Sequence, residues 1–161
     1  MKRILNVTVL TLTAFVLLAT VSVMAIERPF ALNAKGVAIF NTDGSGTPIS
    51  ANVSSSGTAT HLGSTITVGT INFSPDPANP NRLLTSGSGT MTAANGDTVQ
   101  LELNGGLEVT PGSVTATDKA VFRFVGGTGR FAGAHGTANG IVVVNLLTGA
   151  FDITIVGDID F

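Results

Sequence analysis

Along most of the chain, apolar and polar residues alternate in short runs, and this alternation predicts a protein built from β-strands. The runs are rich in Thr, Val, Ile and Phe, and clusters of Gly, Asn, Asp, Ser and Pro separate them. We expect eight strands, near residues 35–41, 57–61, 64–73, 84–93, 98–104, 118–125, 131–145 and 150–161. Eight antiparallel strands can close into a barrel whose interior is filled by side chains or holds one small ligand.

In several strands the alternation shows which side chains face the interior. Val99, Leu101 and Leu103 share one face of their strand, and Phe122 and Phe124 share one face of another. The last strand alternates in the same way. The charged residues that these patterns place on the outer faces are Lys119, Arg123, Glu102 and Asp152.

The strand near residues 64–73 departs from simple alternation. Its apolar positions shift from Ile66 and Val68 to Ile71 and Phe73. Such a shift predicts a bulge beside Gly69, which would bend the strand as a barrel requires.

Residues 141–144 are four consecutive apolar residues, so this strand is apolar on both faces. Its outer side therefore needs a cover. Either a loop formed by residues 74–83 folds over it, or this side is a subunit interface.

The N-terminus has the features of a secretory signal peptide. Lys2 and Arg3 precede an apolar run that ends at the small residue Ala25. We expect cleavage after Ala25 and one domain at residues 26–161, either secreted or in the periplasm of a bacterium; an uncleaved membrane anchor is the alternative. The sequence has no cysteine, which excludes lipoprotein attachment and disulfides.

Composition disfavours two classes of partner. Loss of Lys2 and Arg3 would change the formal net charge from −2 to −4, which argues against nucleic acid. Tyr and Trp are absent, which removes the usual stacking platforms for sugars. The same absence argues against an outer-membrane barrel, although the terminal Phe161 is typical of one. Membrane contact is therefore expected only through an uncleaved leader.

A glycine-rich segment, residues 125–136, interrupts the apolar pattern near the end of the chain. It reads VGGTGRF and then AGAHG. The segment lacks the Lys-Ser/Thr ending of a phosphate-binding loop, so a structural hairpin is favoured, and no cofactor is expected. In this interpretation Phe131 plugs one end of the barrel, and Arg130 lies in solvent or pairs with a carboxylate.

The amino-acid sequence of this segment resembles that of the corresponding hairpin in the allene oxide cyclase and dirigent proteins, and in small secreted bacterial proteins with the same barrel. The resemblance implies a single eight-stranded antiparallel barrel. It also implies a trimer, because the plant proteins are trimers. The plant cyclase holds a reactive fatty-acid epoxide in an apolar barrel that contains an acidic residue, and dirigent proteins steer radical coupling with inward acids and hydroxyls.

No inward acid can be matched to those families in this sequence. We therefore expect an exported, non-catalytic barrel that binds a small apolar ligand or serves as a structural component of the envelope or exterior. A cyclase-like or isomerase-like enzyme acting on a small hydrophobic substrate is the alternative. The residues expected to contact a ligand are His61, Phe122, Phe124 and Phe131.

Candidates for metal binding are weak. His61 and His135 have no carboxylate at ligand spacing, so zinc is not expected. Oxygen-bearing side chains alternate from Asn41 through Asp43 to Thr47, like the first half of a calcium loop, but the closing position is Asn52. An Asx-type turn is the favoured interpretation.

Overall fold

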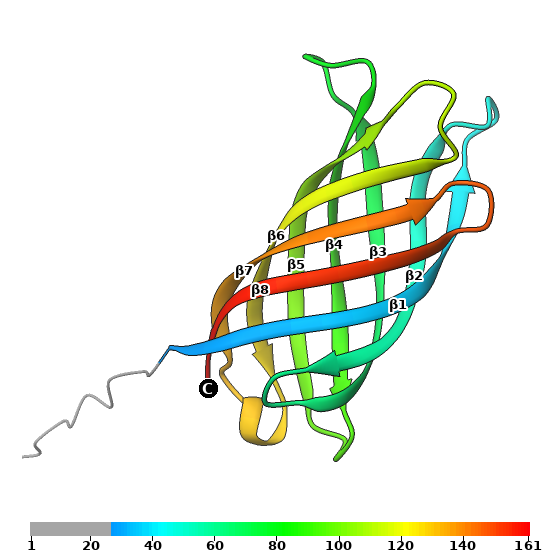
Figure 1. Cartoon of the computed structure of the whole chain (residues 1–161). Coiled ribbons are helices and arrows are strands. Elements are labelled where there is room, and N and C mark those ends of the chain that lie inside the picture. Colours follow the sequence, from blue (N-terminus) through cyan, green and yellow to red (C-terminus); the bar gives the residue numbers. More distant parts are fainter. Residues whose placement is uncertain (1–26) are drawn as a thin grey trace, which may run out of the picture.

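A computed structural model describes residues 27–161, which form a closed barrel of eight antiparallel strands (Figure 1). The predicted fold class is confirmed. The predicted signal peptide, residues 1–25, lies outside the described residues. The strands are β1 (Arg28–Thr42), β2 (Pro48–Ala59), β3 (Gly63–Pro75), β4 (Arg82–Ala93), β5 (Thr98–Val109), β6 (Thr115–Gly127), β7 (His135–Asn145) and β8 (Ala150–Asp160), and a short 3-10 helix, η1 (Gly129–Phe131), follows β6.

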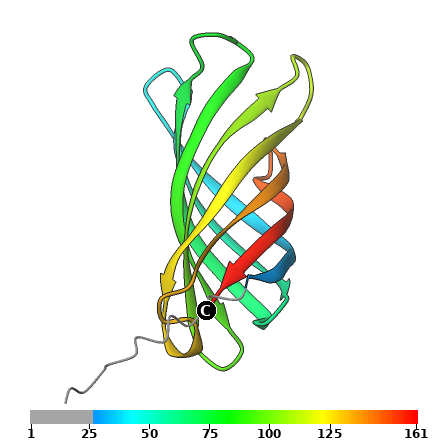
Figure 2. The same cartoon turned by 90° about the vertical axis from the view of Figure 1, so that its left-hand side faces the viewer.

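Pairing of the first strand with the last closes the sheet. Every strand pairs with its neighbours in sequence, and β1 also pairs with β8, where Arg28 lies opposite Ile159. The start of β1 and the C-terminus therefore lie at one end of the barrel, together with η1 (Figures 1 and 2). We call this end the Phe131 end. The opposite end, the Phe40 end, carries the loops 43–47, 76–81, 110–114 and 146–149.

The barrel interior contains two groups of packed apolar side chains. The larger group lies toward the Phe131 end and includes Phe30 and Phe124, whose ring centroids are 4.8 Å apart. The smaller group lies toward the Phe40 end and includes Leu107, Val144 and Phe151. The alternation predicted for 98–104 and 118–125 is confirmed, and the four charged side chains placed outside, Lys119, Arg123, Glu102 and Asp152, are all exposed.

Several predictions about individual strands are wrong. Strand β1 begins at Arg28, seven residues before its predicted start at residue 35. Strand β2 begins at Pro48 and ends at Ala59, not at residues 57–61, because alternation of small residues such as Ala51 and Ser55 is a weak apolar signal. No bulge lies beside Gly69, because β3 keeps an unbroken register with both neighbours. Ile66 and Val68 instead point outward and are 60% and 52% exposed.

The outer side of β7 is not covered by the loop at residues 74–83. Ile141 and Val143 are 53% and 45% exposed, so that alternative is wrong. The described chain leaves these side chains in solvent, and a subunit interface stays a prediction.

The glycine-rich segment closes one end of the barrel. The predicted strand at residues 131–145 included Phe131, but Phe131 lies in η1, because a 3-10 turn precedes β7. The Phe131 side chain is fully buried, and its ring centroid lies 4.7 Å from that of Phe161. The Arg130 guanidinium lies over the Phe131 ring, with its Cζ 4.8 Å from the ring centroid. The prediction that Phe131 plugs one end is therefore confirmed.

Gly129→Val is expected to destabilise the protein. Gly129 has a φ of +58°, a left-handed conformation that costs an L residue about 1–2 kcal/mol. A Cβ at this position would also overlap the Asp97 carboxylate, which adds to the loss. Gly133→Val is the control, because Gly133 has a φ of +82° and open space around it. Urea unfolding of both variants tests this: equal losses would show that the overlap with Asp97 has no effect.

Candidate functional site

A cavity of about 90 Å³ lies inside the barrel, between its middle and the Phe40 end. Its walls are mainly apolar and include Leu103, Phe122 and Val142. Phe40 and Phe73 line it near the end of the barrel, with ring centroids 5.9 Å apart, and both are only half-buried. The Phe131 end is sealed by fully buried side chains, so the Phe40 end is the less covered route to the cavity.

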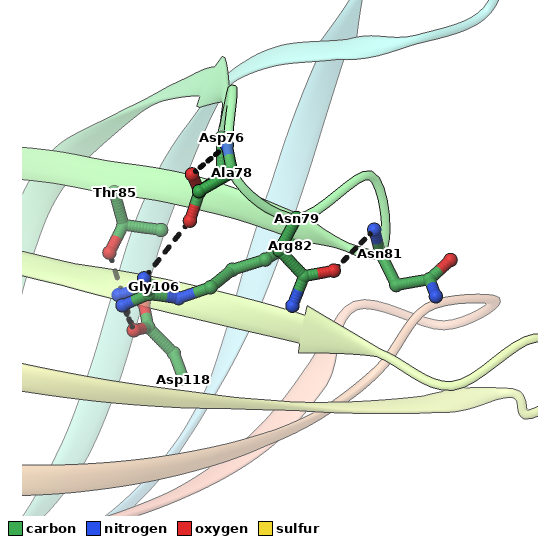
Figure 3. Close-up of polar contacts among 8 residues, drawn as sticks. All are labelled: Asp76, Ala78, Asn79, Asn81, Arg82, Thr85, Gly106 and Asp118. Carbon is green, nitrogen blue, oxygen red and sulfur yellow. Dashed lines mark hydrogen bonds and ion pairs between the residues drawn. The ribbon is translucent and has the colours of Figure 1, made fainter.

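One carboxyl group lies in this apolar cavity. Among the lining residues of the described chain, Asp118 alone has an ionisable side chain, and it is only 6% exposed. Its Oδ1 accepts a hydrogen bond from the Gly106 N–H at 3.0 Å and another from the Thr85 hydroxyl at 3.3 Å (Figure 3). Neither bond ends on its Oδ2. Ser55 and Thr67 also line the cavity, and Thr67 Oγ1 is buried without a hydrogen-bond partner among residues 27–161. The site is thus one acid, with one oxygen held by the protein, and two hydroxyl groups.

An ion pair lies near this acid, between Arg82 at the start of β4 and Asp76 in the loop before it. The Arg82 guanidinium pairs with Asp76 at 3.1 Å and extends over Gly106 (Figure 3). A Cβ at position 106 would occupy the space of the guanidinium, so glycine there lets the Arg82 side chain lie across β5. Contacts therefore connect the loop 76–81 to the Asp118 carboxyl: Asp76 pairs with Arg82, Arg82 lies over Gly106, and the Gly106 N–H donates to Asp118.

Burial raises the pKa of the Asp118 carboxyl above its ordinary value of 3.8. The hydrogen bonds from Thr85 and Gly106 and the charge of Arg82 act in the opposite direction, but desolvation is the larger effect. A carboxyl group with a raised pKa in a cavity can donate a hydrogen bond, or a proton, to a bound molecule.

The expectation that no acid faces the interior is wrong. Asp118 lies two residues before Ala120 and four before Phe122, and all three point inward. The alternation of the strand therefore indicates that Asp118 points inward, although an acid on an otherwise apolar face is not expected. Thr85 and Arg82 could not have been assigned to the site, because their approach to Asp118 and Gly106 depends on the pairing of β4, β5 and β6.

The pH dependence of stability tests the raised pKa of Asp118. Between the unfolded pKa of 3.8 and the higher folded pKa, the folded protein retains a proton that the unfolded chain has released. The free energy of unfolding therefore falls as the pH rises through this window, by at most about 1.4 kcal/mol per pH unit. The amide side chain of the Asp118→Asn variant cannot titrate. The free energy of unfolding of the wild type, minus that of Asp118→Asn, should therefore decrease as the pH rises from 3.8 to the folded pKa of Asp118. Urea unfolding from pH 3.5 to 8 measures this difference, and a flat or rising difference would contradict the argument.

The four residues expected to contact a ligand do not meet in one place. Phe122 lines the cavity, but Phe124 and Phe131 pack in the core of the Phe131 end. His61 lies in the turn after β2 at the same end, with its Nε2 3.0 Å from the Pro29 carbonyl oxygen. Of the four, only Phe122 is placed to touch a molecule held beside Asp118.

The loop at Asp43 is an Asx-type turn. Asp43 Oδ1 accepts hydrogen bonds from the backbone N–H groups of Ser45 and Thr47, both at 2.9 Å. These bonds and one from the Ser45 hydroxyl lower the pKa of Asp43. No three His, Asp or Glu side chains gather to hold a metal ion anywhere in residues 27–161.

Comparison with family models, with curated proteins and with solved structures finds no match for this chain. In the described part of the chain, no helix has the length and apolar character needed to cross a membrane.

Proposed function

We propose that this protein is an exported, non-catalytic barrel that binds a small, mostly apolar molecule in the cavity beside Asp118. The supporting observation is the pairing of a mainly apolar cavity with a few buried polar groups, those of Asp118, Ser55 and Thr67, of which the Asp118 carboxyl is the ionisable one. Ligand sites commonly combine apolar walls with a few polar groups that orient the ligand. An apolar cavity of 150 Å³ holds benzene, so a cavity of about 90 Å³ holds about three or four carbon atoms. A longer molecule would extend between Phe40 and Phe73.

Native mass spectrometry of the protein purified from its own host tests this proposal. We expect an apolar molecule to leave when the intact protein is denatured. Ala51→Leu adds three carbon atoms to a fully buried residue in the cavity wall and should abolish this binding. Asn52→Leu is the matched control, because residue 52 lies on the outer face of the same strand. Equal binding by both variants would refute the cavity as the site, and a protein that neither carries nor takes up any apolar molecule would favour a structural role.

Asp118 also supports a second candidate function, a cyclase-like or isomerase-like enzyme. A buried acid with a raised pKa is suited to protonate a substrate held against it. The nearest polar partners are Thr85 and Gly106, whereas His61, in the turn between β2 and β3, and His135, at the start of β7, lie at the Phe131 end, so Asp118 would act without a histidine base. Turnover of the molecule released from the wild type, lost in Asp118→Asn while binding persists, would establish the enzyme. Binding with no chemical change would establish the non-catalytic barrel.

A further inference from the structure

The hydrogen bonds around Asp118 distinguish its two oxygen atoms. Both bonds end on Oδ1, and the one from Gly106 comes from a backbone N–H, which can only donate. In a protonated carboxyl group the carbonyl oxygen is the better acceptor. When Asp118 is protonated, this geometry therefore favours Oδ1 as the carbonyl oxygen and Oδ2 as the oxygen that carries the proton.

The charges near Asp118 agree with a neutral carboxyl group. Arg82 is the nearby cation, and Asp76 already balances its charge at 3.1 Å, with a side chain that is only 9% exposed. Asp118 is not needed as a counter-ion, and burial raises its pKa. An ionised Asp118 would leave Oδ2 charged and unpaired against apolar walls, which is costly.

We infer that the ligand is an uncharged molecule with a carbonyl oxygen, such as a small ketone or ester, and that Asp118 donates a hydrogen bond from Oδ2 to this oxygen. This inference rests on the proposed function, because it specifies the chemistry of a ligand in the same cavity. The carbon skeleton of the ligand packs against the apolar wall that includes Leu103, Phe122 and Val142. A cationic amine would require an ionised Asp118, and a carboxylate would place a second acid beside it.

Three probes separate these alternatives: a ketone, an amine of similar size, and an atom that forms no hydrogen bond. The probes are 2-pentanone, 1-aminopentane (a cation at neutral pH) and xenon, which enters apolar cavities without hydrogen bonding. Binding to the purified protein is followed by NMR through the methyl groups of Leu103 and Val142. The variants are Asp118→Asn, which keeps a donor and an acceptor in the same shape, and Asp118→Leu, which removes both.

We expect the wild type to bind 2-pentanone at least about tenfold more tightly than 1-aminopentane, since a neutral Asp118 offers no counter-charge to an ammonium group that loses its hydration in the cavity. Asp118→Asn should bind 2-pentanone within about threefold of the wild type, because its amide N–H replaces the acid O–H. Asp118→Leu should lose about tenfold for 2-pentanone while it still binds xenon.

Three outcomes would overturn the inference. Tighter binding of 1-aminopentane would show an ionised Asp118. If xenon binds, and the wild type and Asp118→Leu bind 2-pentanone with equal affinity, the cavity is a binding site but Asp118 has no role in it. Failure of all three probes to bind the wild type would refute the proposed function together with the inference. If Asp118→Leu does not fold, tighter binding of 1-aminopentane than of 2-pentanone by the wild type still overturns the inference.

Discussion

Replacing Phe131 with alanine is expected to lower the free energy of unfolding by about 3–5 kcal/mol. The Phe131 side chain is completely buried and packs edge-on against Phe161 at the Phe131 end. Its removal leaves a void that neighbouring strands cannot fill, because each is held in the closed hydrogen-bonded sheet. Urea unfolding measures the loss.

Leu147→Ala is the control for this experiment. Leu147 is 79% exposed in the loop between β7 and β8, so the same kind of truncation should change stability by less than about 0.5 kcal/mol. A loss below about 1 kcal/mol for Phe131→Ala would contradict the view that this ring closes the barrel.

A second large effect is expected from Gly140→Val, a loss of about 2–3 kcal/mol from overpacking. Gly140 faces the interior, and the Phe122 ring lies in the space that a Cβ would occupy. Val would push the ring out of its place in the cavity wall, so binding of an apolar probe should change as well. Urea unfolding and xenon binding measure the two effects.

The cause can be isolated with a double mutant. In a Phe122→Ala background, Gly140→Val should cost less than about 1 kcal/mol, because the ring that it displaces is gone. Gly44→Val is the surface control, since nothing lies within 4 Å of a Cβ at that position. If Gly140→Val costs the same with and without the Phe122 ring, the collision is not the reason for the loss.

The fold was predictable wherever large apolar residues alternate with polar ones. Phe122 and Leu101 identified their strands and faces correctly, because only one face of each strand could be buried. The start of β2 was missed because its inward residues include Ala51 and Ser55, which are small and resemble a loop. The outward direction of Ile66 and Val68 was not predictable from their apolar character, because a barrel also exposes isolated apolar side chains.

The candidate site was less predictable than the fold. The inward direction of Asp118 follows from alternation with Ala120, so this part was available from the sequence. The proximity of Arg82 to Gly106 was not, because it depends on the register of β4 against β5 and on a side chain crossing a glycine. Contacts between strands far apart in sequence carry no periodic signal.

The meeting of the first and last strands also means that this barrel suits circular permutation. Arg28 and Ile159 are paired across the closing seam, so in a variant that starts at β1 a short peptide linker could join Arg28 to the C-terminus. New termini could then be opened in a loop at the Phe40 end, such as 43–47 or 110–114, with the order of strands around the barrel unchanged. The chain ends of such a permuted protein would lie beside the less covered end of the cavity, where a fluorescent label could report on ligand entry.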